Sequence, residues 1–500
     1  MKKLLTFILL LGFILNAQSK ENLVNPLDYG LRTAVTDIDR YNALLKCHQY
    51  ARDNGFGVTY EGVDTIFIEI PSKFTSIPLT EYTDFCGATI IVTNHVKTGY
   101  LFYLINNLKP IQVEASMIDS ADFYSVEALR NGMHLLVIKD ESMWVDNRSG
   151  RDYGHQRKDI ILVKDGIGLN KPIMPYDNEQ SRPNCSCCVT TDSLKVIKNL
   201  HFVREQSSNK NTELFRINQQ NNIMISNVTI KTYNGSKMTG DRCISVTNST
   251  NVVFEDIKVD GTYSTKDVFG YAFNLENVWN HIGRRISGKA EWGLYGNYDI
   301  NLTILEDCEL NRYDIHCYGK DVFCKNCTFN GVTLAFSSIY GTMMFENCTY
   351  DKAVPLGIRQ DYNAYTPFDV KWHNCTFNLA SGKNFIVKVN GLSSDISKRP
   401  ELAQKCLPNI EMKDCVINAP GNMSSINLFT VGKVDYPHKV GHISMVNIDG
   451  LKITGGKGIN GINIFSKEIK TDVMIKKALT NISISKDKAS NRRNWSHIIL

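Results

Sequence analysis

Short stretches in which apolar and polar residues alternate recur along most of the chain, and many of them carry one shared phrase. The phrase reads EDCEL at Cys308, KNCTF at Cys327, ENCTY at Cys348, HNCTF at Cys375 and KDCVI at Cys415. Alternation predicts β-strands, because successive side chains of a strand point to opposite faces. A strand phrase that recurs every ~20 to 29 residues predicts a parallel β-solenoid, in which each turn stacks on the one before.

The position held by cysteine in this phrase also accepts other small apolar residues. KNLHF places Leu200 there, SNVTI places Val228 and EDIKV places Ile257, and we interpret Ile282 in NVWNHI as the marker of an intervening turn. Cysteine therefore fills a hydrophobic position in the core, and most of these thiols are expected to be free. The chain has 14 cysteines. The closely spaced ones lack a second ligand pair at zinc-finger distance, so zinc is the minor alternative.

An amphipathic helix is expected to cover the N-terminal end of the solenoid. Residues 37–54 place apolar side chains near helical spacing, with Asp37 as the N-cap and Gly55 just after the end. The fold class is therefore all-β, a single-stranded parallel β-helix with an N-terminal capping helix. The predicted organisation is a signal peptide in residues 1–17, a cap with early irregular turns in 18–194, regular turns carrying the site in 195–420, and last turns with a C-terminal cap in 421–500.

Composition excludes several classes of protein. An apolar share of 43% and a charged share of 21% exclude a disordered chain. The 34 glycines and 13 prolines are ordinary usage and exclude a collagen-like sequence. The formal net charge is +5, and no dense basic stripe is present, so nucleic acid is not an expected partner.

The first residues predict export. Lys2 and Lys3 precede an apolar run over residues 4–15, and Ala17 offers a small residue for cleavage. The run is too short to span a bilayer, and no later segment reaches 18 uninterrupted apolar residues. The protein is therefore expected to be secreted or periplasmic, with no membrane span.

The stretch NRYDIH, residues 311–316, breaks the repeat with residues that a structural turn does not need. Alternation places Arg312, Asp314 and His316 on one face of the strand, and Tyr313 on the other face, towards the core. A histidine beside an arginine and a carboxylate is a candidate acid–base group. The alternative is a solvated strand face with an internal salt bridge.

Two further stretches stand out in the same way. In GIRQDY, Arg359 and Asp361 share a strand face, and the direction of Tyr362 stays open. In EWGLYGNYD, Trp292 and Tyr298 offer a surface for stacking sugars, or alternatively the packing of a tight turn. An exposed, charged strand is the alternative for GIRQDY.

Counting from the marker residues places these features on about the same strand of successive turns. Trp292 lies ten residues past Ile282, His316 eight past Cys308, and Arg359 eleven past Cys348. Stacked turns would align them over about 15 Å along one side of the solenoid. Ala335, at the corresponding position of the turn between, would leave the floor of such a groove open.

The sequence resembles a known group at these residues. The stretches WGLYGNYDINLTILEDCELNRYDIH and IRQDYNAYTPFDVKWHNC are similar to a bacterial group of right-handed parallel β-helix proteins in the pectate-lyase-like superfamily. Gut bacterial glycosaminoglycan lyases of polysaccharide lyase family 29 are the characterised relatives that the stretches resemble. The sequence departs from the group at Tyr313 and Ile315, where Phe and Ala are usual, and at Asn363, where Gly is usual. No Trp follows closely, although the group usually has one after this stretch.

The resemblance implies a polysaccharide lyase that cleaves a uronic-acid polymer, such as chondroitin sulfate, dermatan sulfate or hyaluronan, by β-elimination. This reaction needs a base, an acid for the leaving oxygen, and donors that stabilise the developing enolate. His316 is the expected base, because its pKa lies near the working pH. Arg312 or Arg359 would grip the substrate carboxylate with two hydrogen bonds. Tyr362 is a candidate acid, and Asp314 would orient His316 or an arginine.

Other residues near these stretches are expected to contact the acidic polysaccharide. Tyr313 is also the alternative acid. The predicted substrate-binding residues are Trp292, Asn297, Tyr298, Asn311, Tyr313 and Asp361. Related β-helix lyases often use calcium, but acidic residues are sparse here and each has a basic neighbour, so no cofactor is assigned and calcium stays open.

Two alternatives to a lyase stay open at this point. Asp314 and Asp361 are candidates for the paired carboxylates of an inverting glycosidase, since two turns separate their backbones by roughly 10 Å. A non-catalytic carbohydrate-binding β-helix would explain the aromatic residues without the arginine and histidine set. The sequence predicts neither the specific polysaccharide nor the oligomeric state.

Overall fold

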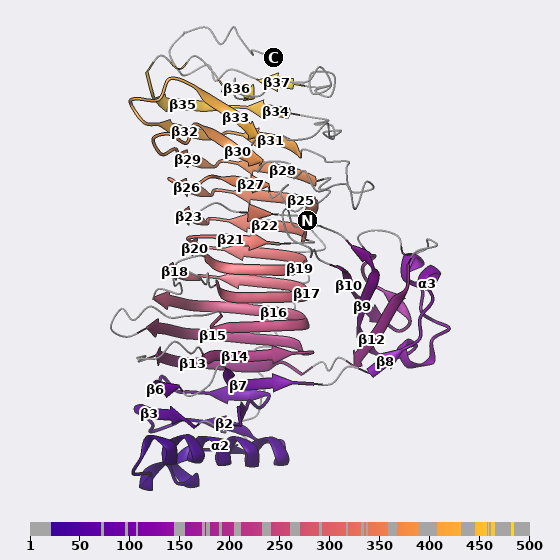
Figure 1. Cartoon of the computed structure of the whole chain (residues 1–500), viewed down its shortest axis with the longest axis vertical. Helices are drawn as coiled ribbons and strands as arrows, with labels where there is room; N and C mark the ends of the chain where they lie inside the picture. Colours follow the sequence, from indigo (N-terminus) through magenta and orange to yellow (C-terminus); the bar gives the residue numbers. More distant parts are fainter. Residues whose placement is uncertain are drawn as a thin grey trace.

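The protein is a right-handed parallel β-helix closed at its N-terminal end by a helix (Figure 1). In this computed structural model the described residues, to which all structural statements below refer, are 22–71, 75–95, 99–106, 109–144, 156–172, 176, 181–189, 193–204, 212–232, 242–260, 271–289, 293–316, 319–331, 335–336, 339–358, 368–389, 408–431, 446–457, 459, 462–465 and 482–484. The predicted signal peptide and the residues Trp292, Arg359, Asp361 and Tyr362 lie outside them. The all-β fold class predicted from the repeated phrase is confirmed.

Each turn of the helix contributes strands to three parallel faces, which we call faces A, B and C. Face A consists of β4 (Ile77–Pro78), β7 (Gly99–Ile105), β14 (Thr212–Asn218), the first parts of β16 (Ile244–Asp260), β17 (Tyr271–Arg284) and β19 (Gly293–Glu306), then β21 (Tyr313–Ile315), β24 (Ala335–Phe336), β27 (Leu356–Ile358), β30 (Phe385–Val389), β33 (Ile426–Val431) and β36 (Ile462–Phe465). Every strand of this face pairs in parallel with the strand one turn later.

Face B follows face A in each turn. Its strands are β1 (Leu23–Val24), β2 (Gly57–Thr59), β5 (Tyr82–Asp84), the first parts of β13 (Lys195–Arg204) and β15 (Asn221–Thr232), the middle of β16, the ends of β17 and β19, then β22 (Gly319–Lys325), β25 (Ile339–Glu346), β28 (Phe368–His373), β31 (Asn409–Lys413), β34 (Val446–Asp449) and β37 (Ile482–Ile484).

Face C completes the turn. Its strands are β3 (Thr65–Ile70), β6 (Thr89–His95), the ends of β13, β15 and β16, then β18 (Ser287–Lys289), β20 (Glu309–Leu310), β23 (Thr328–Asn330), β26 (Thr349–Asp351), β29 (Thr376–Asn378), β32 (Val416–Ala419) and β35 (Lys452–Gly455). The described strands after residue 421 continue the same pairing, so this region adds turns to the stack.

Helix α2 (Asp37–Asn54) covers the open core below β2 and β3, after two short 3₁₀ helices, η2 (Pro26–Tyr29) and η3 (Leu31–Thr33) (Figure 1). The predicted helix is confirmed, but its N-cap is Thr36 and not Asp37. Thr36 and Asp39 form a reciprocal capping box, which satisfies two backbone amides at the helix start. Within the described ranges, no helix combines the length and apolar character that crossing a lipid bilayer requires.

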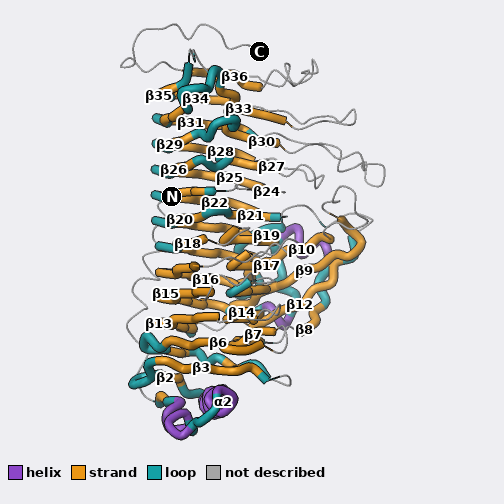
Figure 2. The backbone as a smooth tube through the Cα atoms, turned by 60° about the vertical axis from the view of Figure 1, so that its left-hand side comes forward, coloured by secondary structure: helices purple, strands orange, loops and turns teal. Residues whose placement is uncertain are grey.

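Residues 109–189 do not form the early turns that the sequence pattern predicts. They fold into a separate antiparallel unit, in which the strand order is β11-β10-β9-β12-β8. Its elements are β8 (Lys109–Ile111), α3 (Ala115–Ser120), η4 (Glu127–Leu129), β9 (Met133–Trp144), β10 (Gln156–Lys164), β11 (Ile167–Gly168) and β12 (Pro183–Val189). The unit has its own small core and lies beside the strands β14 to β19 (Figure 2). Alternation alone did not reveal this, because parallel and antiparallel strands share it.

The shared phrase marks a corner at which each turn bends before face C. The residue ahead of the cysteine position has a positive φ, as at Asn326 (53°), Asn347 (55°) and Asn374 (52°). The side-chain amide of Asn347 donates to Asn326 at 3.2 Å, and that of Asn374 donates to Asn347 at 2.8 Å. Asparagine tolerates this left-handed conformation and also joins neighbouring turns, which explains why the phrase so often contains it.

One marker residue in the sequence interpretation was wrong. Ile282 pairs with Val253 on face B, four residues before the corner. The equivalent of the cysteine position is Ile286, which follows Arg285 with a φ of 50°. Here the corner uses arginine in place of Asn or Asp, and this substitution hid the marker.

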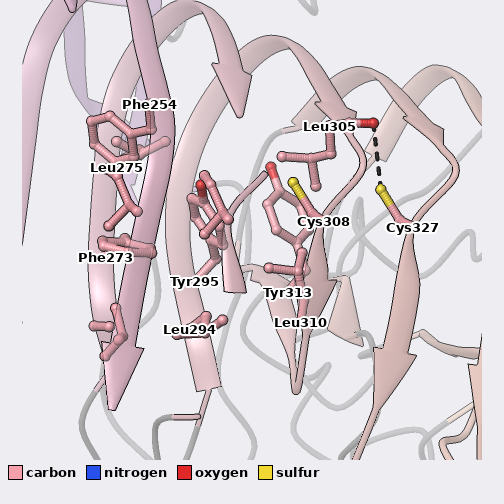
Figure 3. Packing of buried hydrophobic residues seen from close by; sticks show 14 of the residues in the cluster. Phe254, Phe273, Leu275, Leu294, Tyr295, Leu305, Cys308, Leu310, Tyr313 and Cys327 are labelled. Atoms are coloured by element: carbon pink, nitrogen blue, oxygen red, sulfur yellow. Dashed lines mark hydrogen bonds between the residues drawn. The ribbon is translucent and has the colours of Figure 1, made fainter. Parts of the chain in front are cut away.

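The cysteines at the corner are buried, as predicted. Cys308, Cys327 and Cys348 are 1–2% exposed, and their thiols lie within reach of backbone carbonyl oxygens. Figure 3 shows this contact between Cys327 and the carbonyl oxygen of Leu305. None of the cysteines in the described part of the chain forms a disulfide. Burial raises the pKa of the nearby Cys324 thiol well above its ordinary value, so this group is protonated and unreactive.

Thiol titration of the denatured, unreduced protein should therefore find the five corner cysteines free. Each thiol sits in a column of parallel side chains, a geometry that disfavours the torsion of a disulfide between successive turns. Titration with a thiol reagent in denaturant, before and after reduction, measures the difference directly. A large increase after reduction, mapped to these five residues, would contradict the packing described here.

Two fully buried histidines should make the protein less stable in mild acid. Burial lowers the pKa of His48 to about 4 and that of His281 to about 4, against an ordinary value of 6.5. Because the unfolded chain takes up these protons first, stability is fully present above pH 6.5 and declines as the pH falls towards 4. Each histidine contributes roughly 3 kcal/mol to this decline. Urea unfolding at intervals from pH 7 to about pH 4 tests it, and His281→Gln should flatten the slope.

Candidate functional site

Three polar side chains lie on the outer side of face A, one on β21 (Asp314) and one at each end of that strand (Arg312 and His316). Tyr313 and Ile315 of the same strand point into the core, so the alternation predicted from NRYDIH is confirmed. The alternative interpretation, a solvated strand face, is not found, because Arg312 is 6% exposed, Asp314 0% and His316 8%. Polar groups buried to this degree need partners, and the site provides them.

The Asp314 carboxylate is held by a two-pronged contact with Arg312. The Nε atom of Arg312 donates to Oδ1 at 2.8 Å, and a terminal guanidinium nitrogen lies 2.7 Å from Oδ2. This fork-to-carboxylate geometry is the strong form of an ion pair. Because both carboxylate oxygens are engaged, the pair fixes Asp314 in one position.

Tyr271, the first residue of β17, completes the arrangement from two turns away. Its hydroxyl group donates to Oδ2 of Asp314 and lies 3.0 Å from Nε2 of His316. A hydroxyl has one proton to donate, so in this arrangement His316 donates its Nε2 hydrogen to the Tyr271 oxygen. Tyr271 and His316 thus form a hydrogen-bonded pair of two groups that can transfer protons.

Gly296 allows the Tyr271 ring to reach this position. Gly296 pairs with Asp314 across the sheet, and a Cβ atom at Gly296 would overlap the Tyr271 ring. A glycine inside a strand often marks such a close approach. The sequence interpretation missed Tyr271, and Gly296 is the signal that would have indicated a side chain crossing the strand there.

An aromatic ring and an ion pair border the site on the side of the antiparallel unit. Tyr298 of β19 stacks on His316 with a centroid distance of 5.0 Å and an interplanar angle of 26°. Glu276 of β17 pairs with Tyr298 across the sheet, and its carboxylate forms an ion pair with Lys158 of β10 at 2.5 Å. Tyr298 therefore lies in the site as predicted, whereas Lys158 and Glu276 carried no signal in the sequence pattern.

Two predicted substrate-binding residues are in the core instead. Tyr313 is 1% exposed, packs beside Tyr295 and contacts Thr303 at 3.1 Å (Figure 3). Its position inside the core, away from the outer side of face A, removes it as a candidate acid. Asn297 is fully buried, and its Oδ1 atom accepts the backbone hydrogen of Leu275 at 3.3 Å. Both predictions were wrong, because the strand turns these side chains inward.

The structure places the other predicted residues as follows. Asn311 is half-buried in the bend between β20 and β21, next to Gly331 of the following turn. Ala335 pairs with Asp314, two residues earlier in the register than the count from the markers implied, and Gly357 pairs with Ala335. Small residues therefore follow Asp314 in the next two turns of face A, while the open floor of a groove stays a prediction.

The described residues of this site do not fit calcium. Calcium takes six to eight oxygen ligands, and both oxygens of Asp314 already accept from Arg312 or Tyr271. No group of three or more histidine, cysteine, aspartate or glutamate side chains within the described ranges is arranged to hold a metal ion. No catalytic step is therefore derived through a metal.

Comparisons with known proteins give matches among solved structures. No family model matches the sequence, and no curated protein matches it. The tailspike of Pseudomonas phage phi297 is 12% identical with a TM-score of 0.47, over 89% of this chain and 82% of the tailspike. The tailspike of Acinetobacter baumannii bacteriophage AP22, solved with a capsular saccharide, is 11% identical with a TM-score of 0.49, over 92% and 79%. An endo-xylogalacturonan hydrolase from Aspergillus tubingensis is 10% identical with a TM-score of 0.32, over 93% and 99%.

Proposed function

We propose that the protein is a polysaccharide lyase that cleaves a uronic-acid-containing polysaccharide by β-elimination. The observation that carries the proposal is the hydrogen-bonded pair of Tyr271 and His316 at 3.0 Å on the outer side of face A. β-Elimination needs one group to take a proton and another to give one, and this pair provides both. The stacked ring of Tyr298 offers an apolar surface beside the pair, as sugar rings require.

The proton transfers balance within this pair. Neutral His316 takes the proton from the carbon beside the substrate carboxylate, and that electron pair forms the new carbon–carbon double bond as the bond to the leaving oxygen breaks. Tyr271 gives its hydroxyl proton to the leaving oxygen. The His316 imidazolium then passes its Nε2 hydrogen to the Tyr271 oxygen across their hydrogen bond, which restores the tyrosine and leaves a neutral imidazole whose hydrogen is on Nδ1. Proton exchange with solvent returns the imidazole to its starting tautomer.

Arg312 and Asp314 support this pair and do not contact the substrate in the proposal. Asp314 accepts the Tyr271 hydroxyl and so orients it, while Arg312 compensates the buried carboxylate. This changes the role expected for Arg312, because its fork is already occupied by Asp314. Arg359, outside the described residues, stays the expected partner of the substrate carboxylate.

The same geometry disfavours the hydrolase alternative. A glycosidase needs a carboxyl group that can give a proton to, or activate water beside, the glycosidic bond. Asp314 is fully buried and accepts from Arg312 and Tyr271, so it is poorly placed for either task. Its expected partner, Asp361, lies outside the described residues.

The substrate class and cellular location complete the proposal. The expected substrate is a glycosaminoglycan such as chondroitin sulfate, dermatan sulfate or hyaluronan. The tailspike similar to this chain was solved with a capsular saccharide, which is compatible with a polysaccharide ligand on such a fold. The predicted signal peptide would bring the protein to the periplasm or the medium, where such polymers occur.

A panel of acidic polysaccharides, read by ultraviolet absorbance of the unsaturated product, tests the proposed reaction. Rising absorbance on at least one uronic-acid polymer is the expected result. New reducing ends without absorbance would show a hydrolase instead. Binding without either product would show a non-catalytic carbohydrate-binding protein.

His316→Ala should lower turnover by about a hundredfold to ten-thousandfold, as loss of a general base does. Because His316 is buried against Tyr298, we also expect a loss of roughly 1 kcal/mol in stability, more than a surface substitution costs. Initial rates and urea unfolding measure the two effects. His201→Ala, a change on the exposed side of face C, serves as the matched control and should alter neither. Wild-type rates in His316→Ala would remove His316 from the mechanism.

A further inference from the structure

A row of outward-facing residues runs along face A through the site. Towards the N-terminal end, the row passes from Asp314 to Gly296, then Asn274 and Ser245. Ser245 and Asn274 are only 1% and 2% exposed, although they point away from the core of the β-helix. Something outside the β-helix therefore covers this part of the face.

The antiparallel unit provides the cover. Its strand β10 lies against β17, and its strand β9 lies against β16. Lys158 reaches down from β10 to the Glu276 carboxylate, which projects from the next outward row of face A. In the described structure, the hydroxyl of Ser245 and the amide nitrogen of Asn274 are buried without a hydrogen-bond partner. A polar group without a partner would be hydrated if water could reach it. The burial of these two groups therefore indicates that the unit packs closely on this part of face A.

Towards the C-terminal end of the β-helix, the antiparallel unit does not cover the row. Beyond Asp314 the row continues through Ala335 and Gly357 to Lys388, which is exposed. Its first two members are small residues, and the backbone of Lys388 lies three strand spacings, about 14 Å, from that of Asp314. Figure 1 shows the unit beside the strands from β14 to β19, and the strands from β27 to β36 extend past it.

We infer that the antiparallel unit blocks one end of the substrate groove, so that the protein engages a polysaccharide at its chain end and releases short products. This inference rests on the proposed function, because it places the polymer on face A. From the strand of Glu276 to the strand of His316 there are two strand spacings, about 10 Å. Tyr298 lies on the strand between them, so a short saccharide would lie over the Tyr298 ring between the blocked end and the reactive pair, and the rest of the polymer would leave past Lys388.

Binding without catalysis tests the blocked end separately from the reaction. Tyr271→Phe protein is titrated with chondroitin sulfate, dermatan sulfate and hyaluronan, each in several narrow length fractions at equal mass. The protein bound per milligram should rise in proportion to the number of chain ends. Binding that depends on mass alone would show an open groove and overturn the inference, while absence of binding to every fraction would overturn it together with the proposed substrate class.

The products of the wild-type protein provide the second readout. Chromatography during the first few per cent of turnover should show one short product beside polymer of nearly unchanged size. An early ladder of long oligosaccharides would overturn the inference, even if each carried the unsaturated end that supports the lyase. End-dependent binding with no unsaturated product would instead sustain the inference and remove the lyase.

Charge reversal tests whether the pair of Lys158 and Glu276 holds the end closed. Lys158→Glu and Glu276→Lys each place like charges together and should lengthen the products. The double variant restores the attraction and should restore the short product. Identical products from all four proteins would overturn the assignment of this pair.

Discussion

Tyr271→Phe should lower turnover by about a hundredfold to ten-thousandfold while the protein stays folded, because the change removes one proton-transferring group and keeps the ring. The phenyl ring still fits above Gly296, so packing changes little. The Tyr271 hydroxyl also orients His316, and its loss leaves that imidazole without its 3.0 Å partner. Initial rates by ultraviolet absorbance and melting curves measure the two sides of this expectation.

The matched control for Tyr271→Phe is Tyr82→Phe. Tyr82 also donates to a carboxylate, Asp84, at 3.3 Å, but it lies on face B, away from the site. Tyr82→Phe should therefore leave turnover unchanged. A Tyr271→Phe protein that melts normally and retains wild-type rates would remove Tyr271 from the reaction and leave His316 without its proposed acid.

Arg312→Met should produce the largest loss of stability, about 3–5 kcal/mol, because it leaves the buried Asp314 carboxylate without its cation. Asp314 is fully buried, so solvent cannot replace the lost interaction. Equilibrium unfolding in urea measures the loss. The informative partner is the double variant Arg312→Met with Asp314→Leu, which should recover most of the stability, since removing both members of a buried pair is often nearly neutral.

Activity separates the two variants of the ion pair from a simple loss of folding. The double variant should stay inactive although it is stable, because Tyr271 no longer has a carboxylate to orient its hydroxyl. A loss below about 1 kcal/mol for Arg312→Met would instead mean that the pair behaves as an exposed salt bridge.

The architecture was predictable because one physical requirement is repeated in every turn. The cysteine position must hold a small apolar side chain in the core, and the residue before it must accept a positive φ. Both requirements restrict which residues occur in the phrase, so both can be recognised in the sequence. The pattern is broken at Arg285, where an arginine adopts the left-handed conformation. Because of this exception, the sequence interpretation took Ile282 as the marker of that turn.

The site was predictable only where neighbours in the sequence are neighbours in space. Strand alternation correctly grouped Arg312, Asp314 and His316, because these residues lie on one short strand, β21, or directly beside its two ends. Tyr271 lies 43 residues before Asp314, so only the three-dimensional stacking brings it there. Burial of the group was equally hidden, since local sequence does not say what covers a strand face.

The asparagine corner has a consequence for how proteins of this kind change. Because Asn326, Asn347 and Asn374 repeat the same bend and the same amide contact, the chain from one corner to the next behaves as an interchangeable module, of 21 residues in the first case and 27 in the second. Duplication or excision of one module would leave the row of asparagine contacts between neighbouring turns intact. The distance from the covered end of face A to any later residue would then change only in whole steps of about 4.8 Å. Groove length in such a protein is therefore inherited in discrete units, and the length of a bound saccharide would be set by counting modules.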